Sequence, residues 1–178
     1  SGLCAGLGVL TPEQKECGVL VIDLGGGSTS FLAYADGAIA AAGAVGVGGD
    51  HITNDISLGF NIPIKRAEIL KHEFGAAIAD PSVCAQSINV PPEVGFSGCT
   101  LALADLNAIV NARMDELLCL VRGEMERAGL ARSFGAGVVL CGGGAHLRGV
   151  ERLAAEVFDM PCSIGRPRNV GGAASMFD

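Results

Sequence analysis

The chain has 178 residues, of which 49% are apolar and only 4% aromatic, and its net charge is −7. This negative charge repels a phosphate backbone, so nucleic-acid binding is not expected. The seven cysteines include no CxxC pair and the three histidines are scattered. Metal-ligand spacing is therefore absent, and the thiols are predicted to be free and buried, as in a reducing cytoplasm. The longest aliphatic runs, about five residues, are far short of the roughly 18 that span a bilayer.

The first part of the chain predicts three consecutive antiparallel strands. After a helix end and a loop over residues 1–17, the continuous apolar run 18–24 predicts a central strand buried on both faces. Three glycines follow, and then a second strand at 28–35. The "DG" pair at 36–37 indicates a two-residue hairpin turn, and 38–47 returns as a third strand.

Two helices are predicted next. The segment "GVGGDHITNDI" is expected to be a loop that becomes a helix near Asp50. A second helix begins at Pro63 and ends at Gly75. Its apolar positions, spaced as on one helix face, are predicted to pack inward: Ile64, Ala67, Leu70 and Phe74.

The remainder predicts one long helix and a second strand that ends in glycines. Residues 76–102 look irregular, apart from a short strand at 87–90. A stripe stepping by three and four predicts an amphipathic helix about 39 Å long, through Leu103, Leu106, Val110, Met114, Leu117, Val121 and Met125. "GAGVVLCGGGAHLRGV" then reads as an apolar strand, three glycines and a helix, and "PCSIGRP" as a closing strand.

The stretch "DLGGGST" has the composition of a phosphate site. Gly25, Gly26 and Gly27 allow a sharp turn whose N–H groups form a concave anion site. Ser28 and Thr29 add hydroxyl donors. Asp23, at the end of the strand, is placed to hold a Mg²⁺ ion or its water against phosphate oxygens. A P-loop would need a lysine after the glycines, and a dinucleotide motif would need a helix there, so neither alternative fits.

A second cluster, Gly142, Gly143 and Gly144, ends the second apolar strand. Two such junctions on one sheet can face one ligand from two sides, although each could also be only a tight turn. Between them, Glu68 and Lys71 lie three residues apart on one helix face, opposite the apolar stripe. They could form a surface ion pair, or they could reach the sugar and base of a nucleotide.

Five motifs in this order resemble the actin/Hsp70 superfamily of ATP-binding proteins, and within it the FtsA family of bacterial cell-division proteins. "VIDLGGGSTS" resembles the second phosphate motif, and "GVGGDHITNDI" a Gly-Gly…Thr-x-Asp-Ile segment. "AEILKHEFG" is similar to the helix that flanks ribose and adenine, "GVVLCGGGAHLRGV" to the adenosine motif, and "CSIGRP" to a closing strand. The likeness covers nearly the whole chain.

The resemblance implies an α/β fold with an actin-like (RNase H-like) subdomain 2A, in two parts at 1–52 and 129–178. An α+β subdomain 2B would be inserted between them at 53–128. The first phosphate motif, its subdomain and subdomain 1C would precede residue 1, and an amphipathic membrane helix would follow residue 178. The chain is thus expected to be the carboxyl-proximal half of such a protein.

The resemblance also implies ATP and Mg²⁺ as ligands. It places Asp23 through Thr29 on the phosphates, and Gly49, Glu68, Lys71 and the second glycine cluster around the rest of the nucleotide. Because phosphoryl transfer needs groups on both sides of the phosphates, the whole protein is expected to have at most weak ATPase activity. This chain alone is expected to bind ATP weakly without hydrolysing it, and no catalytic residue is assigned.

In the family, the tail of the tubulin-like protein FtsZ docks on subdomain 2B near the start of the long helix. "ARMDELLCLV" resembles that segment, so the resemblance makes Arg113 the docking candidate, with a solvated helix arginine as the alternative. The upstream segment "PPEVGFSGCTLALAD" lacks the basic loop usual in the family. Self-association into filaments is also implied, as is a cytoplasmic location at the cell membrane of the division site. Membrane contact itself would come only through segments outside this chain.

Two other functions remain open at this point. A related scaffold, such as the pilus protein PilM, would bind partners more than it turns over ATP. Sugar and acetate kinases share the fold and the phosphate turns, but a kinase would need a catalytic acid and a substrate cleft, which neither glycine junction displays.

Overall fold

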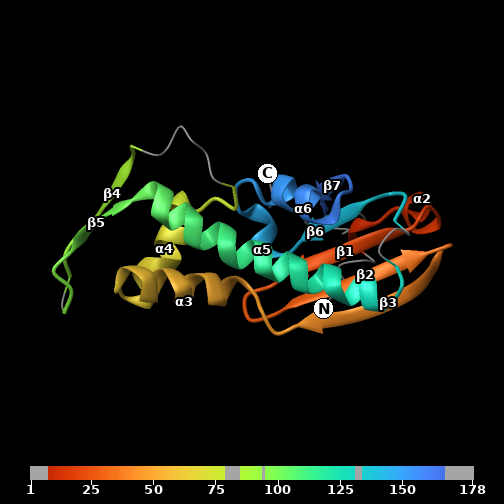
Figure 1. Cartoon of the computed structure of the whole chain (residues 1–178), viewed down its shortest axis with the longest axis horizontal. Helices are drawn as coiled ribbons and strands as arrows, with labels where there is room; N and C mark the ends of the chain where they lie inside the picture. The colour runs from red at the N-terminus through yellow and green to blue at the C-terminus, as the bar shows by residue number, and fades with distance from the viewer. Residues whose placement is uncertain (1–7, 79–84, 94, 131–133, 167–178) are drawn as a thin grey trace, which may run out of the picture.

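The computed structural model describes residues 8–78, 85–93, 95–130 and 134–166. Its main sheet has five strands in the order β3-β2-β1-β6-β7, and a separate pair is formed by β4 and β5 (Figure 1). The strands are β1 (Val19–Leu24), β2 (Thr29–Ala35), β3 (Ala38–Val45), β4 (Ser87–Val90), β5 (Cys99–Ala102), β6 (Val138–Cys141) and β7 (Cys162–Ile164). The helices are α2 (Pro12–Glu16), α3 (Gly49–Phe60), α4 (Ile64–Phe74), α5 (Leu103–Arg127), the 3₁₀ turn η2 (Gly143–His146) and α6 (Val150–Phe158).

The central strand β1 is buried on both faces, as its apolar run predicts. It pairs antiparallel with β2 and parallel with β6. Leu20 and Ile22 point into the larger core under α5 and α6, whereas Val19 and Val21 belong to a second core with Tyr34 on the other face. The continuous hydrophobic run is therefore explained by the pleat, which sends alternate side chains to two cores.

The predicted meander is confirmed. Strands β1, β2 and β3 pair antiparallel in sequence. Asp36 and Gly37 both have positive φ, at 51° and 77°, which is the geometry of the two-residue hairpin turn. β3 ends at Val45, two residues short of the prediction, and β7 lies at the opposite edge of the sheet.

Helix α5 holds the two ends of the molecule together. Figure 1 shows it running from the β4–β5 pair, past α3 and α4, to the main sheet. The predicted stripe is buried along its whole length, through Leu103, Leu106, Val110, Met114, Leu117, Val121 and Met125. The boundary predicted after residue 52 falls inside α3, and the one after residue 128 falls just beyond α5.

Helix α4 corrects two predictions about its faces. Ala67 and Leu70 are buried as expected, but Ile64 is 50% exposed, because it sits in the first turn, ahead of the part of α4 that packs against the core. Lys71 was expected opposite the apolar stripe, yet it is only 8% exposed. It lies four residues after Ala67, so it shares the buried face.

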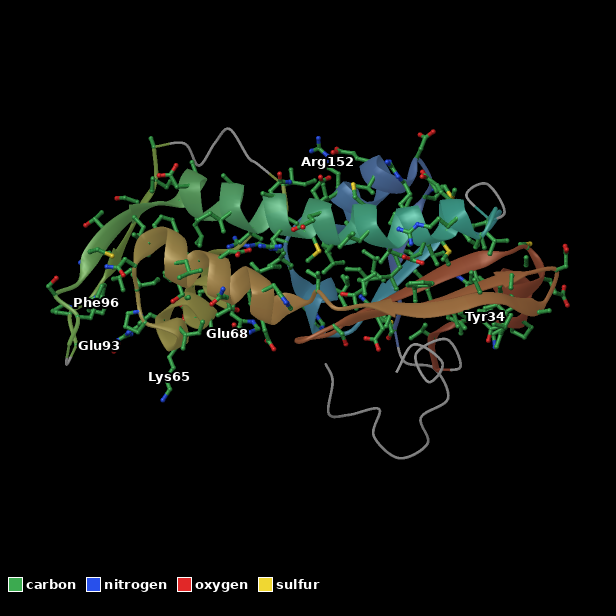
Figure 2. All side chains as sticks on the ribbon, turned by 60° about the horizontal axis from the view of Figure 1, so that its bottom comes forward. Tyr34, Lys65, Glu68, Glu93, Phe96 and Arg152 are labelled. Carbon is green, nitrogen blue, oxygen red and sulfur yellow. The ribbon has the colours of Figure 1, made fainter. Side chains whose placement is uncertain are left out.

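The region 76–102 contains a strand that the sequence did not reveal. β4 was predicted, but its antiparallel partner β5 was missed, because only four residues separate the loop from the long helix. The pair forms an arm that projects beyond α3 and α4, and Figure 2 shows Glu93 and Phe96 near its end. Arg66 on α4 holds the arm through an ion pair with Glu93 at 2.9 Å.

The cysteines of the described ranges are free thiols, as predicted: Cys17, Cys99, Cys119, Cys141 and Cys162. Only Cys141 is buried, and Cys17 is exposed because it ends the short surface helix α2. The expectation of burial was therefore wrong for Cys17 and met only in part by Cys99, Cys119 and Cys162, which are half-buried, while Cys4 and Cys84 lie outside the described residues. Among the helices that the structure describes, none combines the length and hydropathy needed to cross a membrane.

The turn after β1 is joined directly to the start of α3. The N–H groups of Gly49 and Asp50 each donate to a carbonyl of that turn, to Gly25 O and Gly26 O, both at 2.9 Å. Gly48 lies so close that a Cβ there would be 2.3 Å from Gly26 O. Its φ of −158° is ordinary extended backbone, so glycine is required here by close approach rather than by conformation.

We predict that Gly48→Ala lowers the free energy of unfolding by about 2 kcal/mol, the usual cost of overpacking a tight contact. Gly46→Ala is the matched control, because a Cβ at Gly46 would meet nothing within 4 Å. Urea unfolding followed by circular dichroism measures both. Equal stability of the two variants would contradict the claim that this junction is close-packed.

Candidate functional site

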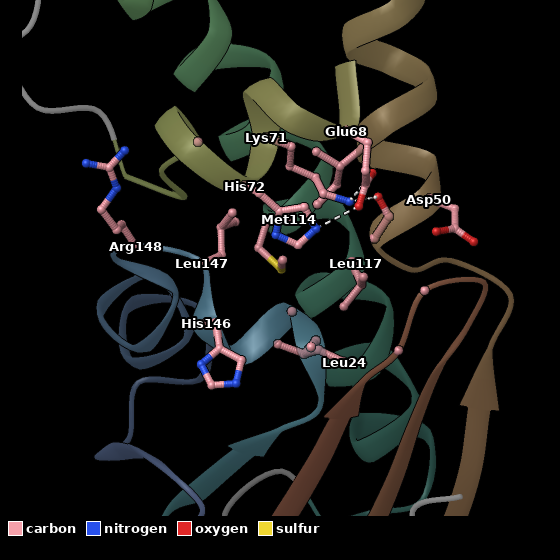
Figure 3. Close-up of a pocket in the computed structure, with 17 residues that line it drawn as sticks. Leu24, Asp50, Glu68, Lys71, His72, Met114, Leu117, His146, Leu147 and Arg148 are labelled. Atoms are coloured by element: carbon pink, nitrogen blue, oxygen red, sulfur yellow. Dashed lines mark hydrogen bonds and ion pairs between the residues drawn. The ribbon is translucent and has the colours of Figure 1, made fainter. Parts of the chain in front are cut away.

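A pocket of about 270 Å³ lies where the main sheet meets α3, α4 and α5 (Figure 3). Its walls come from five separate segments of the chain, so it exists only in the folded protein. Six of the lining residues come from the two glycine turns and from α4: Gly25, Gly26, Glu68, Lys71, Gly143 and Gly144.

The two glycine turns face this pocket from different strands. Gly25 and Gly26 follow β1, Gly143 and Gly144 follow β6, and all four line the pocket. Since β1 and β6 are adjacent and parallel, their carboxyl ends lie at the same edge of the sheet. The two glycine turns therefore converge on one pocket, as the sequence predicts.

The glycines are needed for different reasons. A Cβ at Gly25 would lie 2.6 Å from Ser28 O, and one at Gly144 would lie 2.7 Å from Leu24 Cβ. These two are required by the fold itself. A Cβ at Gly143 would meet nothing within 4 Å, so at this wall glycine leaves open space that the protein does not use.

Lys71 is the centre of a hydrogen-bond network behind the pocket wall. Its Nζ donates to Gly49 O at 3.0 Å, to Thr53 Oγ1 at 2.7 Å and to Glu68 Oε2 at 2.8 Å. All three donors of the ammonium group are thus used. The Thr53 hydroxyl also bonds Glu68 Oε2. This is a built interhelical contact between α3 and α4 rather than the surface ion pair that was the alternative.

Glu68 presents its carboxylate at the rim of the pocket. Burial acts to raise its pKa, but hydrogen bonds from Lys71 and Thr53, the Lys71 charge and His72 outweigh burial, so the pKa lies below its ordinary value of 4.5. His72 Nε2 lies 2.8 Å from Glu68 Oε1. The network thus holds an ionised acceptor at a fixed position, and Figure 3 shows Glu68, Lys71 and His72 together.

Five of the predicted residues do not line the pocket: Asp23, Gly27, Ser28, Thr29 and Gly142. Asp23 lies behind the second glycine turn, since a Cβ at Gly142 would be 2.5 Å from Asp23 Oδ1. Burial and the Asp23 carboxylate raise the pKa of the neighbouring Cys141 thiol to about 11. Thr29 is fully buried, and within the described residues its hydroxyl has no hydrogen-bond partner.

Several lining residues were missed by the sequence analysis. Met114 and Leu117 form an apolar floor, but in the sequence they belong to the core stripe of α5 and nothing distinguishes them from it. Asp50, His146 and Arg148 add polar groups at the rim. Asp50 follows a Gly-Gly pair at the start of a helix, and His146 follows a glycine turn. These positions were the sequence features that could have identified both residues as part of the site.

The predicted docking residue Arg113 lies outside the pocket, on α5. Its guanidinium makes a two-point contact with Asp55 on α3, at 2.6 Å and 3.0 Å, and it also pairs with Glu116 at 2.5 Å. These contacts, against some cost of burial, raise the pKa of Arg113 above its ordinary value. Its side chain remains 28% exposed. Arg113 is therefore neither a freely solvated arginine nor a buried one.

No metal site is formed by the chain's own side chains in the described ranges, where no group of three or more histidine, cysteine or acidic residues gathers. Asp23 alone does not make a Mg²⁺ site.

Residues 20–176 match the family model described as "Cell division protein FtsA". The FtsA proteins of Neisseria meningitidis serogroup B and Pseudomonas aeruginosa are each 35% identical over 171 and 170 residues. Each match covers 96% of this chain but 41% of the relative, so the chain spans about two fifths of the length of these relatives.

Two solved structures show the same architecture. MreB5 of Spiroplasma citri bound to ADP has a TM-score of 0.76 at 24% identity, covering 93% of this chain and 54% of that one. PilM in a type IV pilus biogenesis complex with PilN has a TM-score of 0.63 at 19% identity, covering 88% and 38%. At such identities the likeness shows the fold alone, and that fold is the predicted actin-like one.

We predict that Glu68→Gln lowers stability at neutral pH and less so in acid. The folded-state pKa of Glu68 is depressed, so its contribution is present above the unfolded value near 4.5 and is lost as pH falls through the folded value. The difference in unfolding free energy between the two proteins should therefore shrink below pH 4.5. Urea unfolding at pH 7 and at pH 3.5 measures it.

Glu156→Gln is the matched control, since Glu156 pairs with Arg152 on the exposed side of α6 and such pairs contribute little. A Glu68→Gln penalty that is the same at both pH values would show that the network does not depend on the charge of Glu68.

Proposed function

The chain belongs to the FtsA family of cell division proteins, and on that premise we propose that it forms one wall of an adenine-nucleotide site. The observation that carries the proposal is the convergence of the two glycine turns with the Glu68–Lys71 network on one pocket. MreB5 of Spiroplasma citri, which has the same fold, was solved with ADP and with AMPPNP.

The residues present suit such a ligand. The apolar floor of Met114 and Leu117 can cover the face of a base, and the fixed Glu68 carboxylate can accept hydrogen bonds from sugar hydroxyls. The open space at Gly143 lets a ligand approach the backbone closely. In the proposal, Gly25 and Gly26 at the pocket wall, with Gly27 and Ser28 of the same turn, lie toward the phosphates, whereas the fully buried Thr29 supports the turn from behind.

Mg²⁺ would neutralise phosphate charge in such a complex. Asp23 is the residue through which this chain would contact the ion or its water, and further ligands would come from the nucleotide, water or other parts of the protein. The chain's own contribution in this proposal is to hold and orient the nucleoside end of the ligand.

The pocket is small for a complete nucleotide site, since small-molecule sites usually measure about 300–1,000 Å³. Together with the chain's share of its relatives' length, this supports the proposal that other parts of the protein complete the site. We therefore expect this chain by itself to bind ATP weakly and not to hydrolyse it. Micromolar affinity with turnover, measured by calorimetry, would contradict this.

We further propose the cell-division role of the family for the whole protein. In this role, the whole protein assembles into filaments through subdomains 2A and 2B and binds the tail of FtsZ at Arg113. It links FtsZ to the cytoplasmic face of the membrane through segments outside this chain. Membership of the family supports the division role, and the partly exposed guanidinium of Arg113 supports the docking site.

We predict that Gly143→Val weakens ATP binding at least tenfold while leaving the fold intact, because the added side chain enters open space at the pocket wall. Gly46→Val is the matched control, as its Cβ also meets nothing but lies outside the pocket. Ligand-observed NMR with millimolar ATP measures the affinity. Equal binding by both variants would place the nucleotide elsewhere.

We predict that Arg113→Glu weakens binding of an FtsZ carboxyl-terminal tail peptide at least tenfold, since a charge reversal at a contact residue adds repulsion. Fluorescence anisotropy of a labelled peptide measures this. Circular dichroism and urea unfolding control for the ion pairs with Asp55 and Glu116, which Arg113→Glu also removes. Unchanged affinity would remove Arg113 from the docking site.

A further inference from the structure

The guanidinium of Arg113 is already occupied by carboxylates of its own chain. Its Nε and one terminal nitrogen bond the two oxygens of Asp55, and the other terminal nitrogen bonds Glu116. These hydrogen bonds use three of the five N–H donors of the guanidinium and place two carboxylates beside it. An incoming carboxylate would therefore meet a group whose positive charge is already compensated and whose two-point edge is taken by Asp55.

The two acidic partners differ in their positions. Glu116 lies three residues along the same helix and its side chain is 52% exposed, so it can swing into solvent. Asp55 belongs to α3, is 25% exposed and makes the two-point contact that best fits a guanidinium. Asp55 is thus the competitor that holds Arg113 against α3.

We propose that Asp55 is an autoinhibitory latch, which competes with the carboxylate of an acidic peptide for the two-point edge of the Arg113 guanidinium. This inference rests on the proposed function only in taking Arg113 as the docking residue. The exchange replaces one carboxylate by another on the same guanidinium, so no bond other than hydrogen bonds is made or broken. The affinity for the peptide then depends on the difference in free energy between the Arg113–peptide contact and the Arg113–Asp55 contact.

The latch has consequences beyond one residue, because Asp55 lies six residues after Gly49, whose N–H is bonded to the glycine turn at the pocket. Asp55 and the pocket wall therefore belong to one helix. The release of Arg113 requires only that the Asp55 side chain rotate or that α3 shift slightly from α5.

Asp55→Asn tests the latch, since it keeps the shape of the side chain and removes its charge. We expect the FtsZ tail peptide to bind this variant about three- to fivefold more tightly, the upper part of the range for loss of a favourable, partly exposed ion pair. The measurement is anisotropy of the labelled peptide with the full-length protein that contains this chain.

Asp115→Asn is the matched control for net charge. Asp115 is an exposed neighbour on α5 that accepts a hydrogen bond from the Cys119 thiol, so removing its charge changes the local field without removing a carboxylate from Arg113. We expect less than a twofold change in affinity. Asp55→Ser, which also removes the carboxylate, serves if the asparagine variant unfolds.

The outcomes separate the latch from the docking proposal. Tighter binding by Asp55→Asn alone supports the latch. Unchanged or weaker binding by Asp55→Asn, or an equal gain from Asp115→Asn, overturns the latch even if Arg113→Glu abolishes binding and docking stands. Wild-type affinity in Arg113→Glu, or no binding by any variant, overturns docking and the latch together.

Discussion

The main-chain hydrogen bonds from the start of α3 to the turn after β1 hold the rest of the structure in place. The first N–H groups of a helix have no partners within the helix, and here two of them bond Gly25 O and Gly26 O. The turn is thereby fixed with its carbonyls toward α3. Since Gly48 packs directly on those carbonyls, α3 cannot move away from the sheet without exposing both groups.

Lys71 extends this constraint from α3 to α4. A buried ammonium group must be compensated by acceptors, and it finds them in Gly49 O at the start of α3 and in Glu68 on its own helix. The same three donors therefore tie two helices and the pocket rim together. Because the network ends in Glu68, the position of the acceptor at the rim is set by the interior of the protein and not by the flexible surface.

Periodicity predicted the elements that bury regular stripes. The continuous apolar run of β1 and the three-four spacing of α5 depend only on local pattern, and both elements were recovered. Contacts between segments that are distant in the sequence were not predicted. β5 is short, and its pairing with β4 is set by register. The burial of Lys71 depends on an acceptor 22 residues away. For the same reason the motifs located the glycine turns, but could not show that Met114 and Leu117 form the pocket floor.

Helices α3 and α5 each contact both the pocket and Arg113. Ile52 of α3 and Met114 of α5 line the pocket. Asp55, about one turn after Ile52, and Arg113, the residue before Met114, join the same two helices. A two-point contact tolerates little displacement, since both hydrogen bonds weaken together when the groups tilt. In the proposal, a ligand that changed the spacing of α3 and α5 at the pocket would also change the hold on Arg113. Reciprocity would then require that release of Arg113 change the affinity for that ligand by the same factor.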